Sequence, residues 1–135
     1  MSVRPRDLLD QAKSLQSGAG EVSARGSISR AYYAALHRAL EIVPQGVGRD
    51  DERNTHQQVI DAVDRLGRGI APGRQAAIQI GRLLRQLRKS RVLADYQLAE
   101  DLSPDEAETA IGRAEKLFGL CSEVERLRQQ PASPK

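Results

Sequence analysis

The chain has 135 residues, enough for one domain that buries roughly two thirds of the surface its unfolded form would expose. It contains no Trp, one Phe and three Tyr, and Leu, Ala, Arg, Glu and Gln dominate, so we expect an all-α protein with almost no strand. A formal charge of +3 and a pI near 9.3 make only a weak case for an anionic partner, so the distribution of charge is more informative than its sum.

The composition also argues against membrane, disulfide and metal chemistry. No segment approaches the ~20 apolar residues that a bilayer requires, and the first residues lack the apolar run of a signal peptide, so we expect a cytoplasmic protein. The single Cys121 falls on the apolar side of a predicted helix, where an inert buried thiol is the expected state. The two histidines are too far apart for a metal site, and no cofactor is expected.

Apolar periodicity predicts an antiparallel bundle of about five helices. Pro44 and the polar loop 44–54 end the second helix, and the glycine-rich stretch 67–73 separates the third from the fourth. Ser103 is a predicted N-cap for the last helix, with Pro and Glu at the favoured following positions. We expect a single helical domain over residues 1–129 and a flexible tail at 130–135. The predicted helices span about residues 6–15, 21–43, 56–66, 74–94 and 104–127.

The stretch 27–41, SISRAYYAALHRALE, is apolar on more than one side, which is typical of a helix at the centre of a bundle. Arg30, His37 and Glu41 share its remaining polar strip. The side chains of Tyr32 and Tyr33 are most simply core aromatics whose hydroxyls reach polar partners.

Between residues 65 and 94 the chain has eight basic residues and no Asp or Glu. Arg82, Arg85 and Lys89 form an outward stripe with Arg88 beside it, which predicts a ridge that contacts phosphates. The alternative is a solvated face paired with the acidic residues that follow it. Few aromatic residues accompany the ridge, so stacking on single-stranded bases has little support.

Arg91 occupies a position where a core residue is due. It continues the apolar line of the fourth predicted helix, four residues after Leu87. An unpaired buried guanidinium is unfavourable, so this side chain either extends past the core to solvent or is held by a partner.

Several motifs resemble the HEPN domain superfamily. They are SRAYYAALHRALE at 29–41, Thr55-His56 opening the next helix, LRKSRVLADY at 87–96, and the SPDE start of an Ala-rich last helix. The resemblance spans about residues 4–127 and is closest to small stand-alone prokaryotic members with YYAxxH and RxxADY stretches. It implies an all-α bundle that commonly dimerises and that binds or cleaves RNA. It also implies a role as the toxin of a toxin–antitoxin pair whose partner is a minimal nucleotidyltransferase.

The resemblance is incomplete at the catalytic motif. Catalytic HEPN proteins carry an Arg followed after four to six residues by His, often with a Tyr just beyond. Arg91 and Tyr96 fit this outline, but Ala94 and Asp95 occupy the region where the His is needed. RNA cleavage through the 2′-hydroxyl uses a His to move a proton and an Arg to bind the phosphate, and an ionised Asp is a poor substitute for the former.

We therefore interpret Asp95 as a structural acceptor for Arg30 or Arg91, in a polar network with Tyr96. His37 is either a helix-packing histidine or a replacement for the missing one, if it faces Arg88 or Arg91. His56, next to a predicted cap, is expected to be a cap-region or surface residue.

Three functions remain open. The first is an RNA-binding or partner-binding HEPN protein that works in a toxin–antitoxin-like module without the full ribonuclease motif, and the resemblance implies that it is a homodimer. The second is an active metal-independent ribonuclease that uses Arg91 and His37. The third is a structural adaptor for a minimal nucleotidyltransferase that makes no contact with RNA. The predicted RNA-contacting or anion-contacting residues are Arg82, Arg85, Arg88, Lys89 and Arg91.

Overall fold

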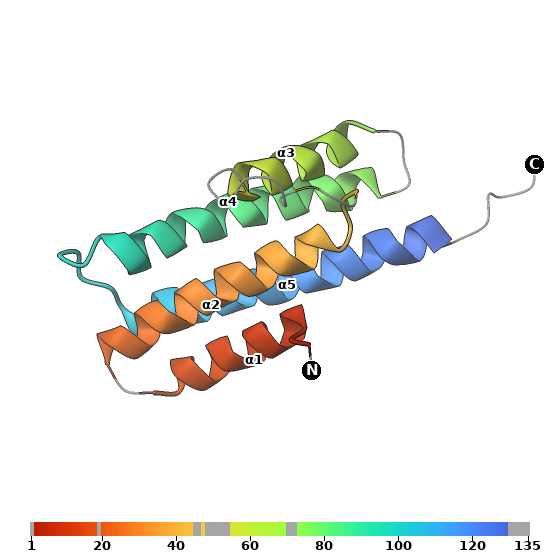
Figure 1. Ribbon diagram of the computed structural model, residues 1–135. Coiled ribbons are helices and arrows are strands. Elements are labelled where there is room, and N and C mark those ends of the chain that lie inside the picture. Colours follow the sequence, from red (N-terminus) through yellow and green to blue (C-terminus); the bar gives the residue numbers. More distant parts are fainter. Residues whose placement is uncertain (1, 19, 45–46, 48–54, 70–72, 130–135) are drawn as a thin grey trace, which may run out of the picture.

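The computed structural model describes residues 2–18, 20–44, 47, 55–69 and 73–129, and within these ranges it contains five helices and no strand (Figure 1). The all-α prediction is therefore confirmed. No helix among these residues is long and apolar enough to span a membrane. In chain order the helices are α1 (Pro5–Gln16), α2 (Glu21–Leu40), α3 (Thr55–Arg68), α4 (Arg74–Tyr96) and α5 (Pro104–Gln129).

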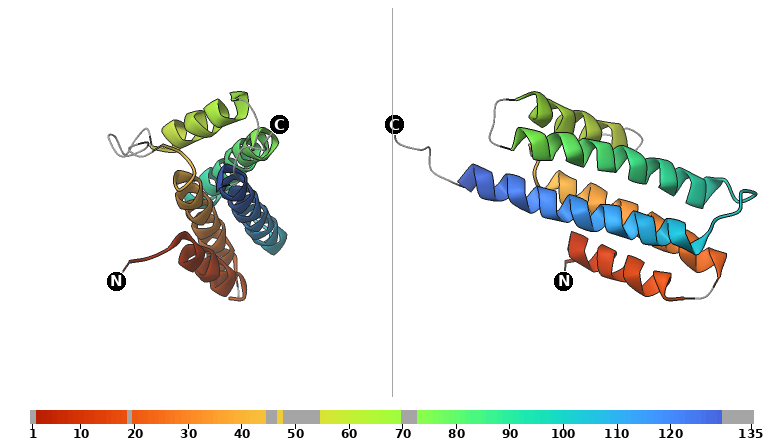
Figure 2. Two further views of the ribbon diagram at one scale, coloured as in Figure 1. Left: turned by 90° about the vertical axis from the view of Figure 1, so that its right-hand side faces the viewer. Right: turned by 180° about the vertical axis from the view of Figure 1, so that it is seen from behind.

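Helices α2, α4 and α5 lie side by side and form the centre of the bundle (Figure 1). α1 packs along α2 and also contacts α5, whereas α3 packs mainly on α4, at the other side of the molecule (Figure 2). Ile28, Ala31 and Tyr32 of α2 are each no more than 1% exposed, which confirms that the stretch 27–41 is central.

Two helix ends differ from the prediction for local reasons. α2 ends at Leu40 rather than at residue 43, because the next two amide groups bond to carbonyls three residues back and tighten the chain ahead of Pro44. α4 continues two residues further than predicted, to Tyr96. The predicted tail 130–135 and most of the loop 44–54 lie outside the described residues.

The start of α5 follows the predicted capping pattern. The amide of Asp105 donates to Ser103 Oγ at 3.1 Å, and the amide of Ser103 donates to a carboxylate oxygen of Glu106 at 3.2 Å. Cys121 of the same helix is fully buried, and burial raises the pKa of its thiol to about 12. The predicted burial of this thiol is confirmed, and its raised pKa is consistent with the low reactivity expected from the sequence.

Candidate functional site

Arg91 is held between an acid and two tyrosines. Its Nε donates to Asp95 Oδ2 at 2.9 Å, and its Nη2 donates to the hydroxyls of Tyr33 at 2.8 Å and Tyr96 at 3.2 Å. The guanidinium carbon also lies 5.3 Å from the centre of the Tyr33 ring and 5.1 Å from that of Tyr96, within the range of cation–π attraction. The side chain is only 14% exposed, so of the two alternatives that the sequence left open the structure shows the one in which partners hold it.

Asp95 accepts from Arg91 rather than from Arg30. It also accepts from the hydroxyl of Ser29 on α2, at 3.2 Å. The Arg30 side chain is exposed, and no hydrogen bond joins it to Asp95 in the described part of the chain. Of the two partners that the sequence left open, the structure therefore selects the one on the same helix, four residues away.

His56 is the residue that the sequence analysis undervalued. It lies in the first turn of α3, as a cap-region residue would, but its ring packs on α2. Its Nδ1 forms a hydrogen bond with the hydroxyl of Tyr32, and the two rings stack with their centres 5.4 Å apart at 25°. The centre of the Tyr33 ring is 6.2 Å away. His56 is therefore half-buried beside the tyrosine that binds Arg91.

The surroundings of this pair determine its protonation. The pKa of His56 is lowered, first by burial and then by the positive charges of Arg88 and Arg91. Burial raises the pKa of the Tyr32 hydroxyl to about 12. Near neutral pH, His56 is uncharged and Tyr32 keeps its proton. We call Tyr32, Tyr33, His56, Arg91, Asp95 and Tyr96 the Arg91 cluster.

A signal for His56 was present in the sequence. The apolar stripe of α3 contains Val59, Ile60 and Val63, all buried. Residue 56 lies three and four positions before the first two of these, on the same face of the helix. The stripe therefore extends to His56, and a polar residue at its end is aimed at the neighbouring helix.

His37 lies elsewhere. It is exposed and lines a hollow of about 290 Å³ with Glu41 and four residues at the start of the chain. None of the residues of the Arg91 cluster lines this hollow. His37 does not face Arg88 or Arg91, because its part of α2 is the side along which α1 packs. The hollow is lined by Val3, Arg4, Pro5, Leu8, His37 and Glu41.

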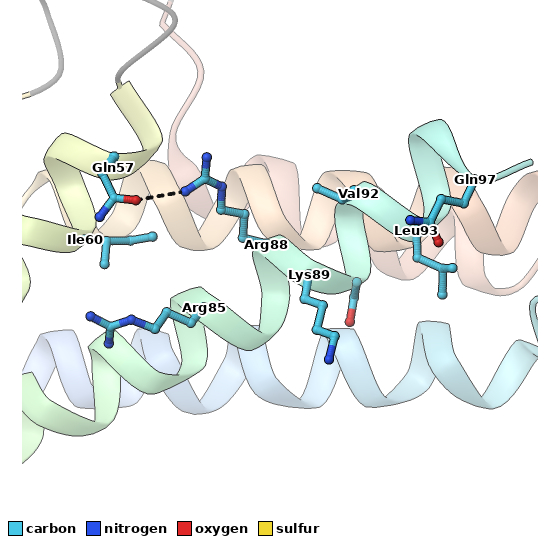
Figure 3. Close-up of a pocket in the computed structure, with 9 residues that line it drawn as sticks. Gln57, Ile60, Arg85, Arg88, Lys89, Val92, Leu93 and Gln97 are labelled. Atoms are coloured by element: carbon cyan, nitrogen blue, oxygen red, sulfur yellow. Dashed lines mark hydrogen bonds between the residues drawn. The ribbon is translucent and has the colours of Figure 1, made fainter.

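A larger hollow, of about 630 Å³, lies along α4 next to the Arg91 cluster (Figure 3). Arg88 connects this hollow with the Arg91 cluster, because it lines the hollow and its charge acts on His56. Its Nη1 donates to Gln57 Oε1 at 3.2 Å. Figure 3 shows Arg85, Arg88 and Lys89 on α4, with Gln57 and Ile60 of α3 across from them. We call this site the basic hollow. Its lining residues are Gln57, Ile60, Arg85, Arg88, Lys89, Ser90, Val92, Leu93 and Gln97.

The predicted outward stripe is exposed in the structure. Arg82, Arg85 and Lys89 all face solvent. Arg85 forms an ion pair with Asp64 of α3, so the acid that it meets comes from the helix before it and not from the acidic stretch that follows α4. No acid of the described residues forms an ion pair with Arg82 or Lys89, so within that part of the chain most of the positive charge of the stripe is uncompensated.

Arg25, which the sequence did not single out, holds the end of α4 in place. Its side chain is 10% exposed, and Nη1 donates to the carbonyls of Leu93 at 3.0 Å and Ala94 at 2.9 Å. Nη2 donates to the carbonyl of Glu100 and to the carboxylate of Glu21 at 3.0 Å. A cation at the carboxyl end of a helix satisfies carbonyls that have no partner within the helix and complements its dipole. This contact explains why α4 continues through the RxxADY stretch.

The fold and the site define a class of protein, a small helical bundle with a tyrosine-rich, half-buried arginine site beside a basic hollow. The family model for the HEPN domain matches residues 6–124. The chain therefore belongs to the HEPN domain family, which is associated with RNA-binding, nuclease and toxin–antitoxin roles. No curated protein and no solved structure matches the chain.

Proposed function

We propose that this HEPN domain binds RNA through the basic hollow and works in a toxin–antitoxin-like module. The observation that supports RNA binding best is the basic hollow itself, in which Arg85, Arg88 and Lys89 meet a partly apolar wall. The arginines and the lysine can bind phosphates, and the apolar side chains can contact bases.

Arg88 is the strongest candidate for a phosphate contact. It is half-buried, and Gln57 orients its guanidinium, so little side-chain freedom is lost on binding. Arg91 has a different role, because Asp95 balances its charge and two tyrosines fix its position. It does not line the basic hollow, and its contacts are with the side chains of the Arg91 cluster.

Binding of a labelled RNA oligonucleotide, followed by fluorescence anisotropy at several salt concentrations, tests the proposal. Arg88→Ala should weaken binding by about tenfold or more, since a hydrogen bond to a charged group contributes about 1.5–3 kcal/mol. Lys116→Ala removes the same charge from an exposed position on α5 and serves as the control. The proposal fails if the wild type has no salt-dependent affinity for RNA, or if both variants bind equally.

The position of His56 favours a second candidate function, metal-independent RNA cleavage. In this mechanism the 2′ oxygen loses its proton and attacks phosphorus, a bond between the two forms, and the bond to the 5′ oxygen breaks; the departing 5′ oxygen takes a proton from water. His56 can take the 2′-hydroxyl proton at Nε2 if Nδ1–H donates to the Tyr32 oxygen, and the lowered pKa of His56 keeps the ring unprotonated at neutral pH. Arg91 lies close enough for its charge to act on the same ring.

Cleavage of labelled RNA in the presence of a chelator tests this candidate. His56→Asn and Arg91→Ala should each abolish cleavage, whereas His37→Asn should keep it, because His37 lies outside the Arg91 cluster. Loss of activity in His37→Asn with retention in His56→Asn would reverse this assignment. Intact RNA with the wild-type protein would leave binding without cleavage as the function.

The module role rests on family membership and calls for a separate test. The product of the adjacent open reading frame should bind this chain, and we expect it to be a minimal nucleotidyltransferase. Expression of the chain alone should slow growth, and co-expression of that product should restore it. Normal growth in both cases, with no complex on co-purification, would argue against a toxin–antitoxin-like role.

A further inference from the structure

A second hollow, of about 310 Å³, lies between α3 and α4, further toward the start of α4. We call it the arginine hollow, because four of its lining residues are arginines and only one is acidic. Arg85 lines both hollows, so they meet at this side chain. The lining residues are Asp64, Gly67, Arg68, Arg74, Ile78, Arg82 and Arg85.

The charge of the arginine hollow is largely uncompensated. Its one acid, Asp64, is paired with Arg85. Arg74 donates to the backbone carbonyl of Gly67 at 3.1 Å, which leaves its charge intact. Arg68 and Arg82 are exposed, and neither side chain forms a hydrogen bond or ion pair with another residue of the described ranges. Within the described ranges, three positive charges, those of Arg68, Arg74 and Arg82, therefore remain without an acid.

Two glycines allow α3 and α4 to approach closely around Arg85. A Cβ added at Gly81 would lie 3.0 Å from Asp64 Oδ1 and 3.3 Å from Arg85 Nη1, and one added at Gly67 would lie 3.0 Å from Ile78 Cγ1. A side chain at position 81 would thus crowd the ion pair, whose atoms would have to shift by a few tenths of an ångström. Because the pair is preserved, Arg85 is held at the junction of the two hollows, where it can contact a ligand that runs through both.

The length of this surface indicates the size of the ligand. From Arg74 to Lys89 the α4 axis advances about 22 Å, at ~1.5 Å per residue. A stacked strand has one phosphate per ~3.4 Å of axis, so this span matches about six phosphates. A mononucleotide or dinucleotide would occupy only part of it.

The chemistry of the walls favours a single strand over a duplex. Apolar side chains lie among the cations in both hollows, with Ile60 and Leu93 in the first and Ile78 in the second. A duplex presents phosphates and sugars at its surface, with its bases paired inside. The described lining of the two hollows holds no aromatic ring, so the bases of a single strand stay stacked on one another and meet the apolar walls with their unpaired edges, while the phosphates follow the cations.

We infer that a single RNA strand of about six nucleotides lies along α4, with the basic hollow and the arginine hollow as consecutive parts of one binding track. This inference rests on the proposed RNA-binding function. It adds that Arg68 and Arg82, which are remote from the Arg91 cluster, contact the same strand.

Oligouridylates of 2, 4, 8 and 12 nucleotides, and a 12-base-pair RNA duplex, are the probes in an anisotropy assay. Affinity should rise up to about six to eight nucleotides and then level off, and the duplex should bind more weakly than the 12-mer strand. The double variant Arg68→Ala/Arg82→Ala should weaken binding of the 12-mer but not of the 2-mer. Its slope of log affinity against log salt should fall by about 1.4, since each phosphate neutralised on a single strand contributes about 0.7.

The control is Lys116→Ala/Arg126→Ala, which removes two exposed charges from α5. Equal losses in the two double variants, equal affinity for the 2-mer and the 12-mer, or tighter binding of the duplex would each overturn the track. Absence of binding to every probe at low salt would overturn the proposed function itself. Length-independent binding would overturn only the track, so the two failures are distinguishable.

Discussion

Replacement of Arg25 by Met should destabilise the fold by about 3 kcal/mol. The substitution retains most of the apolar stem and removes a cation that donates to the carbonyls of Leu93 and Ala94 at the end of α4. Each buried acceptor left without its partner costs about 1–3 kcal/mol, so loss of the donor to these two carbonyls costs about 2–6 kcal/mol. We expect the low end of this range, because the neighbouring acceptors belong to Gln97 and Glu100, whose residues are exposed and accessible to water.

Urea unfolding followed by circular dichroism measures the loss of stability. A loss of about 3 kcal/mol corresponds to a decrease in Tm of roughly 10 °C for a chain of this length. Amide hydrogen exchange should also show that protection falls first at residues 94–97, where the carbonyl contacts end α4. Arg30→Met is the matched control, since Arg30 is an exposed arginine of the same helix. Equal stability of the two variants would refute the capping role of Arg25.

Three further predictions concern single positions. The pKa of His56 is lower in the folded chain than in the unfolded chain, so below the unfolded value of about 6.5 the unfolded chain binds a proton that the folded chain resists. The free energy of unfolding of the wild type and of His37→Asn should therefore decrease from pH 7.5 to 5.5 by more than that of His56→Asn. Equal decreases in all three proteins would contradict this. Gly112→Ala and Gly119→Ala should each raise the free energy of unfolding by about 0.5–1 kcal/mol in thermal unfolding, because a Cβ at either position meets nothing within 4 Å. A loss of stability, or a loss of self-association, would instead indicate that a helix of another molecule packs on these glycines. Cys121 should not react with a thiol reagent until denaturant is added, because its thiol is buried and has a pKa of about 12; prompt reaction in the native state would contradict this.

The features that the sequence predicted well depend on residues close together in the chain. The capping pattern at Ser103 involves only the next three residues. The partner of Arg91 is Asp95, four residues later on the same helix. Apolar periodicity also located the helices, because burial of one face repeats every turn.

The features that the sequence did not reveal depend on which helices become neighbours. Arg25 bonds to carbonyls nearly seventy positions away, and backbone carbonyls leave no mark in a sequence. The choice between His37 and His56 required knowing that α1 packs along α2, near His37, while α3 brings His56 to Tyr32. Periodicity shows which face of a helix is polar but not which helix meets it.

The Arg91 cluster has a consequence for how this protein reaches its native structure. Tyr32, His56 and Arg91 come from α2, α3 and α4, so the cluster exists only after these three helices have docked. A chain emerging from the ribosome has no assembled cluster until residues beyond 96 have left the exit tunnel. A compact intermediate with native helices but loose packing would give a normal far-ultraviolet circular dichroism spectrum without the assembled cluster. The ultraviolet absorbance of Tyr32 should therefore change when His56 stacks on its ring, and this change would report the final docking step.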